Sequence, residues 1–167
     1  MKLEKVGHLY EPQETENYLL RQRNGNGVII DKRTSEKITY ENNRVIALYE
    51  NSISNLNIKG DILIVGLGIG LLPHNFKKLS EVNSISVLEK NIDVINFVKP
   101  IMPWIEFIHT DAFEYDSGRK WDTIFLDIYH NLTPEYKVDQ LVLIEKYSKM
   151  VKDNNISYLK IHNIILW

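Results

Sequence analysis

The chain of 167 residues contains no cysteine. This excludes disulfides, thiolate metal sites and a cysteine nucleophile, and it fits a cytoplasmic setting. No window holds 18 apolar residues, and the N-terminal stretch "MKLEKVGHLYEPQE" lacks the apolar core of a signal peptide. The net charge is only −2 and no basic run is present, so an electrostatic footprint for nucleic acid is missing. We therefore expect a soluble cytoplasmic protein that binds a small molecule, with neither nucleic acid nor a membrane as partner.

What the sequence does contain is a change of pattern near residue 60. Before it, the first 25 residues are polar and irregular, and a Gly/Asn cluster then leads into two β-prone runs and an apolar stretch at helical spacing. After it, apolar runs alternate with helical patterns. The predicted hairpin strands are 27–31 and 36–42, followed by a helix at 44–56. The later strands are 61–66, 84–89, 105–111, 121–127 and 156–167, with helices at 70–80, 91–100 and 133–153.

This alternation predicts an α/β fold with a doubly wound, mostly parallel, Rossmann-like sheet, because parallel strands need crossover connections. We expect residues 1–56 to form an N-terminal extension with the hairpin and a helix, and residues 57–167 the Rossmann-like domain, as one structural unit. Ligands of such sheets bind at the carboxyl ends of the strands.

The glycines at 66, 68 and 70 directly follow the first buried strand, "DILIV". A dinucleotide fingerprint G-x-G-x-x-G would place a third glycine at Leu71 or Pro73, and a phosphate-binding P-loop would need a following G-K-[ST], so both readings fail. The remaining G-x-G-x-G pattern lets the backbone approach a bulky ligand that carries no phosphate.

The stretch "ILIVGLGIG" resembles motif I of class I S-adenosylmethionine-dependent methyltransferases, and Ile64 before the glycines is more similar to the spermidine synthase branch. The hairpin and the Tyr49-containing helix before this motif are also similar to that branch. The resemblance implies that S-adenosylmethionine (SAM) is the cofactor. It implies that the bound cofactor contacts the glycine turn, a ribose-binding carboxylate and an adenine-binding pair, which here are Gly66, Gly68, Gly70, Glu89, Asp111 and Ala112.

The fourth strand, "WDTIFLD", ends in Asp127 and is similar to the corresponding strand of the family. Spermidine synthases continue with D-S-x-D-P, whose acids hold a cationic amine. This chain has "DIYHN", in which His130 replaces the second acid and the proline is missing. The spacing is closer to that of small O-methyltransferases with D-G-D-H. We expect His130 to act as a base that Asp127 orients, and Tyr49 to line the cleft.

Each candidate also has a purely structural interpretation. Glu89 alone is typical of a solvated acid at a strand end, and Asp111 is placed to cap the following turn. Asp127 is placed to cap a loop, and His130 to lie in solvent. A metal site formed by Asp127 with His162 and Asn163 would have one carboxylate to balance a divalent ion, so we expect no metal.

The leading hypothesis is a SAM-dependent methyltransferase-like enzyme with a small-molecule acceptor. The alternatives are a spermidine synthase-like aminopropyltransferase and a non-catalytic nucleoside-binding or interaction module. Methyltransferases of this class continue past the fifth strand, whereas this sequence stops at Trp167, which would leave 156–167 as an apolar edge strand. We therefore expect a homo-oligomer in which a second subunit, or else the N-terminal hairpin, covers this edge.

Overall fold

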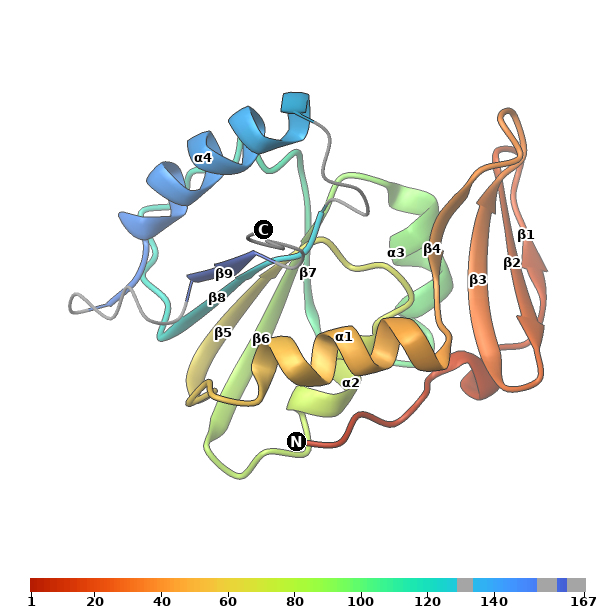
Figure 1. Cartoon of the computed structure of the whole chain (residues 1–167). Helices are drawn as coiled ribbons and strands as arrows, with labels where there is room; N and C mark the ends of the chain where they lie inside the picture. Colours follow the sequence, from red (N-terminus) through yellow and green to blue (C-terminus); the bar gives the residue numbers. More distant parts are fainter. Residues whose placement is uncertain (129–133, 153–158, 162–167) are drawn as a thin grey trace.

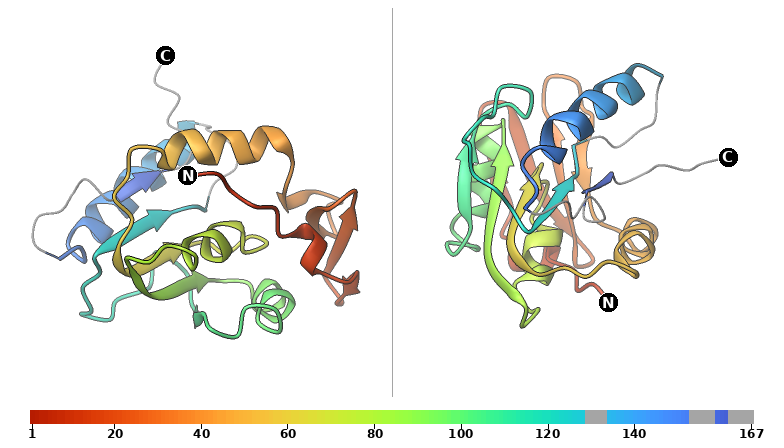
Figure 2. Two further views of the ribbon diagram at one scale, coloured as in Figure 1. Left: turned by 90° about the horizontal axis from the view of Figure 1, so that it is seen from below. Right: turned by 90° about the vertical axis from the view of Figure 1, so that its left-hand side faces the viewer.

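The computed structural model describes residues 1–128, 134–152 and 159–161. In this part of the chain an N-terminal antiparallel sheet stands beside a parallel sheet with helices on both faces (Figure 1). The carboxyl ends of the parallel strands point toward the N-terminal sheet (Figure 2). No helix of the described residues has the length and apolarity needed to cross a membrane.

The N-terminal sheet has the order β1-β2-β3-β4. A short 3₁₀ turn, η1 (Gly7–Leu9), leads into β1 (Gln13–Glu14), β2 (Tyr18–Arg23), β3 (Asn26–Asp31) and β4 (Lys37–Tyr40). The predicted hairpin is confirmed as β3 and β4. The prediction that the first 25 residues are irregular is wrong, because β2 pairs with β3.

The turn between β2 and β3 explains this pairing. Asn24 and Gly25 both have positive φ, 51° and 73°, as required for the tight turn that matches strand twist. Arg23 opposes Asn26 directly across it. Only one side chain of β2, Leu20, is fully buried, so the strand lacks the apolar alternation by which it could have been recognised.

The parallel sheet has the order β7-β6-β5-β8-β9. It consists of β5 (Gly60–Val65), β6 (Val82–Glu89), β7 (Glu106–His109), β8 (Thr123–Leu126) and β9 (Leu159–Ile161). The order reverses between β5 and β8, which are adjacent although 57 residues of sequence separate them (66–122). This reversal is the switch point at which doubly wound sheets bind ligands. The doubly wound α/β prediction is therefore confirmed, while most of the predicted strand 156–167 lies outside the described residues.

Four α-helices connect these strands in the described part of the chain: α1 (Asn43–Ile53), α2 (Leu71–Phe76), α3 (Ile92–Val98) and α4 (Pro134–Ser148). Two of them are preceded by an asparagine N-cap. The side chain of Asn42 accepts a hydrogen bond from the Val45 amide, and that of Asn91 accepts one from the Asp93 amide. Each predicted helix exists, with ends displaced by a few residues.

The core has two layers, one on each face of the parallel sheet. Side chains such as Ile62, Ile64 and Val87 pack with α1, α2 and α3, and with Leu20 and Ile29 of the N-terminal sheet. The alternate side chains of the same strands, including Leu63 and Val65, pack against α4. Strands buried on both faces produce the continuous apolar runs seen in the sequence.

The carboxylate of Glu41 links the N-terminal segment to the sheet that follows it. The side chain is 3% exposed. It accepts hydrogen bonds from the amides of Val6 (2.7 Å), Gly7 (2.9 Å) and Gly27 (3.3 Å). Three backbone donors from two segments therefore converge on one carboxylate.

We expect Glu41→Ala to lower the free energy of unfolding by about 2–4 kcal/mol, because the substitution leaves several buried amides without a hydrogen-bond acceptor. Urea denaturation followed by circular dichroism measures this. Glu16→Ala, at an exposed position, is the control and should change stability by less than about 0.5 kcal/mol. Equal effects of the two substitutions would contradict the role given to Glu41.

Candidate functional site

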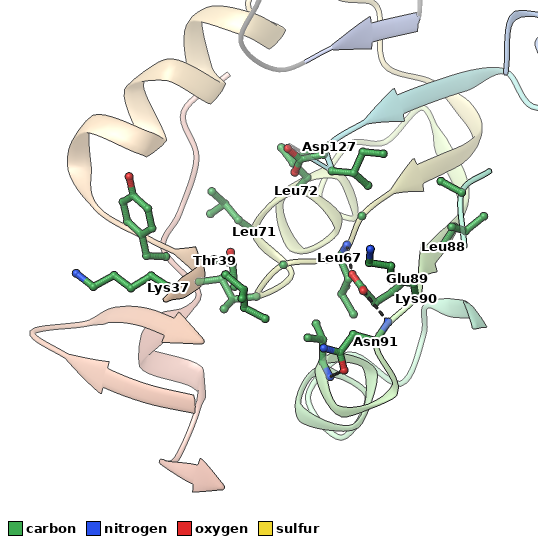
Figure 3. A pocket seen from close by; sticks show the side chains of 18 of the residues that line it. Lys37, Thr39, Leu67, Leu71, Leu72, Leu88, Glu89, Lys90, Asn91 and Asp127 are labelled. Carbon is green, nitrogen blue, oxygen red and sulfur yellow. Dashed lines mark hydrogen bonds between the residues drawn. The ribbon is translucent and has the colours of Figure 1, made fainter. Parts of the chain in front are cut away.

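A cleft of about 700 Å³ lies at the carboxyl ends of β5, β6, β7 and β8. The opposite wall is formed by β4 and α1. Figure 3 shows Lys37 and Thr39 of β4 on one side and Glu89 and Asn91 on the other. The cleft has the size of a small-molecule pocket. Of the predicted cofactor and catalytic residues, it is lined by Gly66, Gly68, Glu89, Asp111, Ala112 and Asp127.

The glycine turn after β5 needs glycine at all three positions, since Gly66, Gly68 and Gly70 have φ of 101°, 53° and 80°. A Cβ at Gly66 would lie 2.3 Å from the Asp127 carbonyl oxygen, and one at Gly68 would lie 3.0 Å from Thr39 Oγ1. Close packing of the protein on itself is thus part of the reason for the pattern.

Gly70 differs from the other two glycines because it is not among the residues that line the cleft. It precedes α2 as its N-cap, and a Cβ there would lie 2.8 Å from Met102 Sδ. The bare backbone at this position accommodates the Met102 side chain. Gly70 is therefore the one predicted glycine that the structure does not place in the cleft lining, and its role as a cofactor contact stays a prediction.

Glu89 is the last residue of β6, and its carboxylate bonds to backbone amides of two segments that line the cleft. Its Oε2 accepts a hydrogen bond from the Leu67 amide (3.1 Å), and its Oε1 accepts one from the Asn91 amide (2.8 Å), as Figure 3 shows. The carboxylate thereby joins the glycine turn to the start of α3. Each oxygen can accept a further hydrogen bond, so the side chain keeps the capacity to bind a pair of hydroxyl groups.

Asp111 and Ala112 follow β7 at the same end of the sheet. Asp111 Oδ1 accepts a hydrogen bond from the Phe113 amide (2.9 Å), so the capping interpretation is correct for this oxygen. The residue also lines the cleft together with Ala112 and Phe113. Capping uses one carboxylate oxygen, and the second can still accept a bond from a ligand.

Asp127 follows β8 and receives a hydrogen bond from α1. The Tyr49 hydroxyl donates to the carboxylate and lies 2.8 Å from both of its oxygens. Within the described residues, no basic side chain forms an ion pair with Asp127. Enclosure of the carboxyl group raises the pKa of Asp127 to about 7, and the Tyr49 hydrogen bond opposes this rise. Burial, with the nearby Asp127 charge, raises the pKa of Tyr49 well above 10, so Tyr49 stays a donor.

The prediction that Tyr49 lines the cleft is confirmed. His130, His162 and Asn163 lie outside the described residues, and the role given to His130 stays a prediction. The sequence analysis missed the contribution of β4, where Thr39 touches the glycine turn and Glu41 reaches the cleft. The hairpin was recognisable, but nothing in its pattern indicated where it docks.

Asp127→Asn tests whether the ionised carboxylate destabilises the fold. The folded state binds the Asp127 proton more tightly than the unfolded state, because the pKa is about 7 in the folded protein and ordinarily 3.8. The contribution of the protonated carboxyl group to stability is therefore present at low pH and is lost as the pH rises through about 7. We expect the variant to be more stable than wild type at pH 8 but not at pH 5, in urea denaturation at both values. A variant less stable than wild type at pH 8 would contradict this.

Comparisons with family models and with curated proteins found no match. Solved structures do match, at low identity. A complex of DhpI with SAM and HEP aligns at 19% identity over 66% of this chain and 50% of that chain, with a TM-score of 0.54. Coclaurine N-methyltransferase, bound to N-methylheliamine and SAH, aligns at 14% identity over 65% and 33%, with a TM-score of 0.52. The glycopeptide N-methyltransferase MtfA with SAM aligns at 13% identity over 65% and 50%, with a TM-score of 0.51.

The chain spans between one third and one half of the length of these three structures. At this level of identity the likeness concerns the fold alone. Together with the strand order and the switch point, it shows that the chain has the Rossmann-like α/β fold of class I SAM-dependent methyltransferases.

Proposed function

We propose that the chain binds SAM in this cleft and transfers the methyl group to a small-molecule acceptor. The observation that carries the proposal is the convergence of the glycine turn, Glu89 and Asp111 on one cleft from three neighbouring strand ends. The fold, whose solved examples include complexes with SAM and SAH, supports the same conclusion.

The hydrogen-bond acceptors present fit an adenosyl ligand. Glu89 has acceptor capacity left on both oxygens for the two ribose hydroxyls, and Asp111 has one oxygen free of the Phe113 amide for the exocyclic amine of adenine. Leu88 and Val94 add apolar surface beside them. When bound, SAM supplies a methyl group activated by its sulfonium.

Asp127 is proposed as the residue that accepts the acceptor's proton. With a pKa of about 7, a large fraction of the carboxyl groups is ionised near neutral pH, and the conjugate acid is weak enough for the carboxylate to act as an effective base. Tyr49 fixes the carboxylate orientation through its hydrogen bond. A cleft-lining carboxylate that forms no ion pair within the described residues also favours a ligand that brings its own positive charge, such as a protonated amine. His130 remains the second candidate for the base.

Aminopropyl transfer from decarboxylated SAM is the alternative. The Tyr49–Asp127 pair supports it, because an acid in this position would also hold a diamine. Binding preference separates the two functions: a methyltransferase should bind SAM more tightly than its decarboxylated form, and an aminopropyltransferase should show the reverse. Cofactor binding without turnover over a broad acceptor panel would favour the non-catalytic module.

Asp111→Asn tests the adenine assignment. The amide oxygen can keep the Phe113 hydrogen bond while the amide nitrogen replaces the second carboxylate oxygen, an acceptor, with a donor. We expect the affinity for adenosine to fall about tenfold, a typical loss when a donor faces another donor, and the affinity for inosine to rise relative to it. Isothermal titration calorimetry measures both.

The matched control for this experiment is Asp116→Asn. Asp116 makes the same kind of turn contact, to the Gly118 amide, in an exposed loop. The Asp116→Asn variant should bind adenosine and inosine as the wild-type protein does. An unchanged preference for adenosine in Asp111→Asn would remove Asp111 from the site.

Asp127→Asn should lower the turnover number about 100-fold or more, the usual contribution of a general base, with little change in the dissociation constant of SAH. The wild-type rate should rise as the pH passes through about 7, where Asp127 loses its proton, and this rise should be absent in the variant. Release of SAH with an acceptor found in a panel of small amines and phenols provides the assay. A variant with the wild-type rate and pH profile would exclude Asp127 as the base.

A further inference from the structure

We propose that Tyr10 and Tyr147 are positioning residues, each of which holds one cofactor-binding loop in its binding conformation from outside the parallel sheet. The inference rests on the proposed function and goes beyond it, since neither side chain is among those that line the cleft. Each acts through the backbone carbonyl of a loop residue.

Tyr10 holds the glycine turn. It lies in the N-terminal segment, is 3% exposed, and donates its hydroxyl hydrogen to the Ile69 carbonyl at 2.6 Å. Ile69 stands between Gly68 and Gly70, and its Cδ1 lies against Gly27 of β3. The turn that offers its backbone to the ligand is therefore fixed to the N-terminal sheet.

Tyr147 holds the loop after β7. It lies on α4, on the opposite face of the parallel sheet, and is fully buried. Its hydroxyl donates to the Ala112 carbonyl at 3.0 Å. Ala112 directly follows Asp111, so this bond fixes the backbone at the proposed adenine site.

Both tyrosines are suited to a permanent donor role. Burial, followed by the charge of Glu41, raises the pKa of Tyr10, and burial, followed by Tyr115 and Asp111, raises the pKa of Tyr147. The hydroxyls therefore stay protonated near neutral pH. Without them, the Ile69 and Ala112 carbonyls would lose a buried hydrogen bond, and other loop conformations would gain population.

A loop that spends less time in its binding conformation lowers the apparent affinity by the same fraction. The two loops serve different parts of the ligand in the proposed site, namely the adenine at residues 111–113 and the thioether chain at residues 66–70. Loss of Tyr147 should therefore weaken every ligand that carries adenine, whereas loss of Tyr10 should weaken SAH more than adenosine; a control that only lowers stability should weaken neither ligand.

The test uses Tyr10→Phe and Tyr147→Phe with Thr123→Val as the matched control. Thr123 is fully buried and donates to the Lys59 carbonyl at 3.0 Å, so its replacement removes the same kind of bond at the amino end of β8, away from the cleft. Dissociation constants for SAH and adenosine are measured by calorimetry on all four proteins, and melting temperatures show that each is folded.

We expect Tyr147→Phe to weaken SAH and adenosine equally, by about fivefold, the equivalent of ~1 kcal/mol. Tyr10→Phe should weaken SAH by a similar factor and adenosine by less. Thr123→Val should bind both ligands as wild type does while its melting temperature falls. Tyrosine variants that fold and bind like Thr123→Val would overturn the inference, and so would losses of equal size in all three variants.

Amide hydrogen exchange on the ligand-free proteins provides a second readout that needs no ligand. Tyr10→Phe should speed exchange in residues 66–72, and Tyr147→Phe in residues 111–115, with each variant leaving the other loop unchanged. Exchange unchanged in both loops would also overturn the inference. Wild-type protein that binds neither SAH nor adenosine would instead refute the proposed function, whatever the exchange shows.

Discussion

The close approach of the Asp127 carbonyl to Gly66 is the constraint on which the cleft depends. Since a Cβ at Gly66 would lie 2.3 Å from that oxygen, only glycine allows the ends of β5 and β8 to meet as they do. The Asp127 amide also donates to the Val65 carbonyl at 2.7 Å, and the Gly66 amide to the Leu88 carbonyl at 2.8 Å. Three strand ends are thereby drawn to one point, and the carboxylates that follow them face a common space.

Around this point, the side chains that stabilise the fold also line the cleft. Glu89 joins the glycine turn to α3, Asp111 caps the turn that follows β7, and Tyr49 links α1 to Asp127. None of these bonds consumes the full acceptor capacity of its carboxylate. A structural role and a ligand-binding role are thus compatible at each position, and the cleft is held in shape before any ligand enters.

The sequence could predict the parts of this molecule that rest on local pattern. Buried parallel strands read as continuous apolar runs. The acids at 89, 111 and 127 were identified from the resemblance to class I SAM-dependent methyltransferases, and the parallel strand order places them at one edge of the sheet. Strand β2 was missed because Leu20 is its one fully buried side chain. The packing of Thr39 against Gly68 could not be foreseen, since the pattern of a hairpin specifies its register but not its neighbours. The packing of Met102 against Gly70 could not be foreseen either, because the two residues are 32 positions apart in the sequence.

The central claim is that this cleft binds an adenosyl thioether through Glu89 and Asp111. A crystal structure of the chain grown with saturating SAH tests it most directly. The account predicts the ribose hydroxyls on Glu89, the adenine amine on Asp111 and the sulfur near the glycine turn. A complex with the ligand bound elsewhere, or a cleft that holds only solvent at saturating SAH, would contradict it.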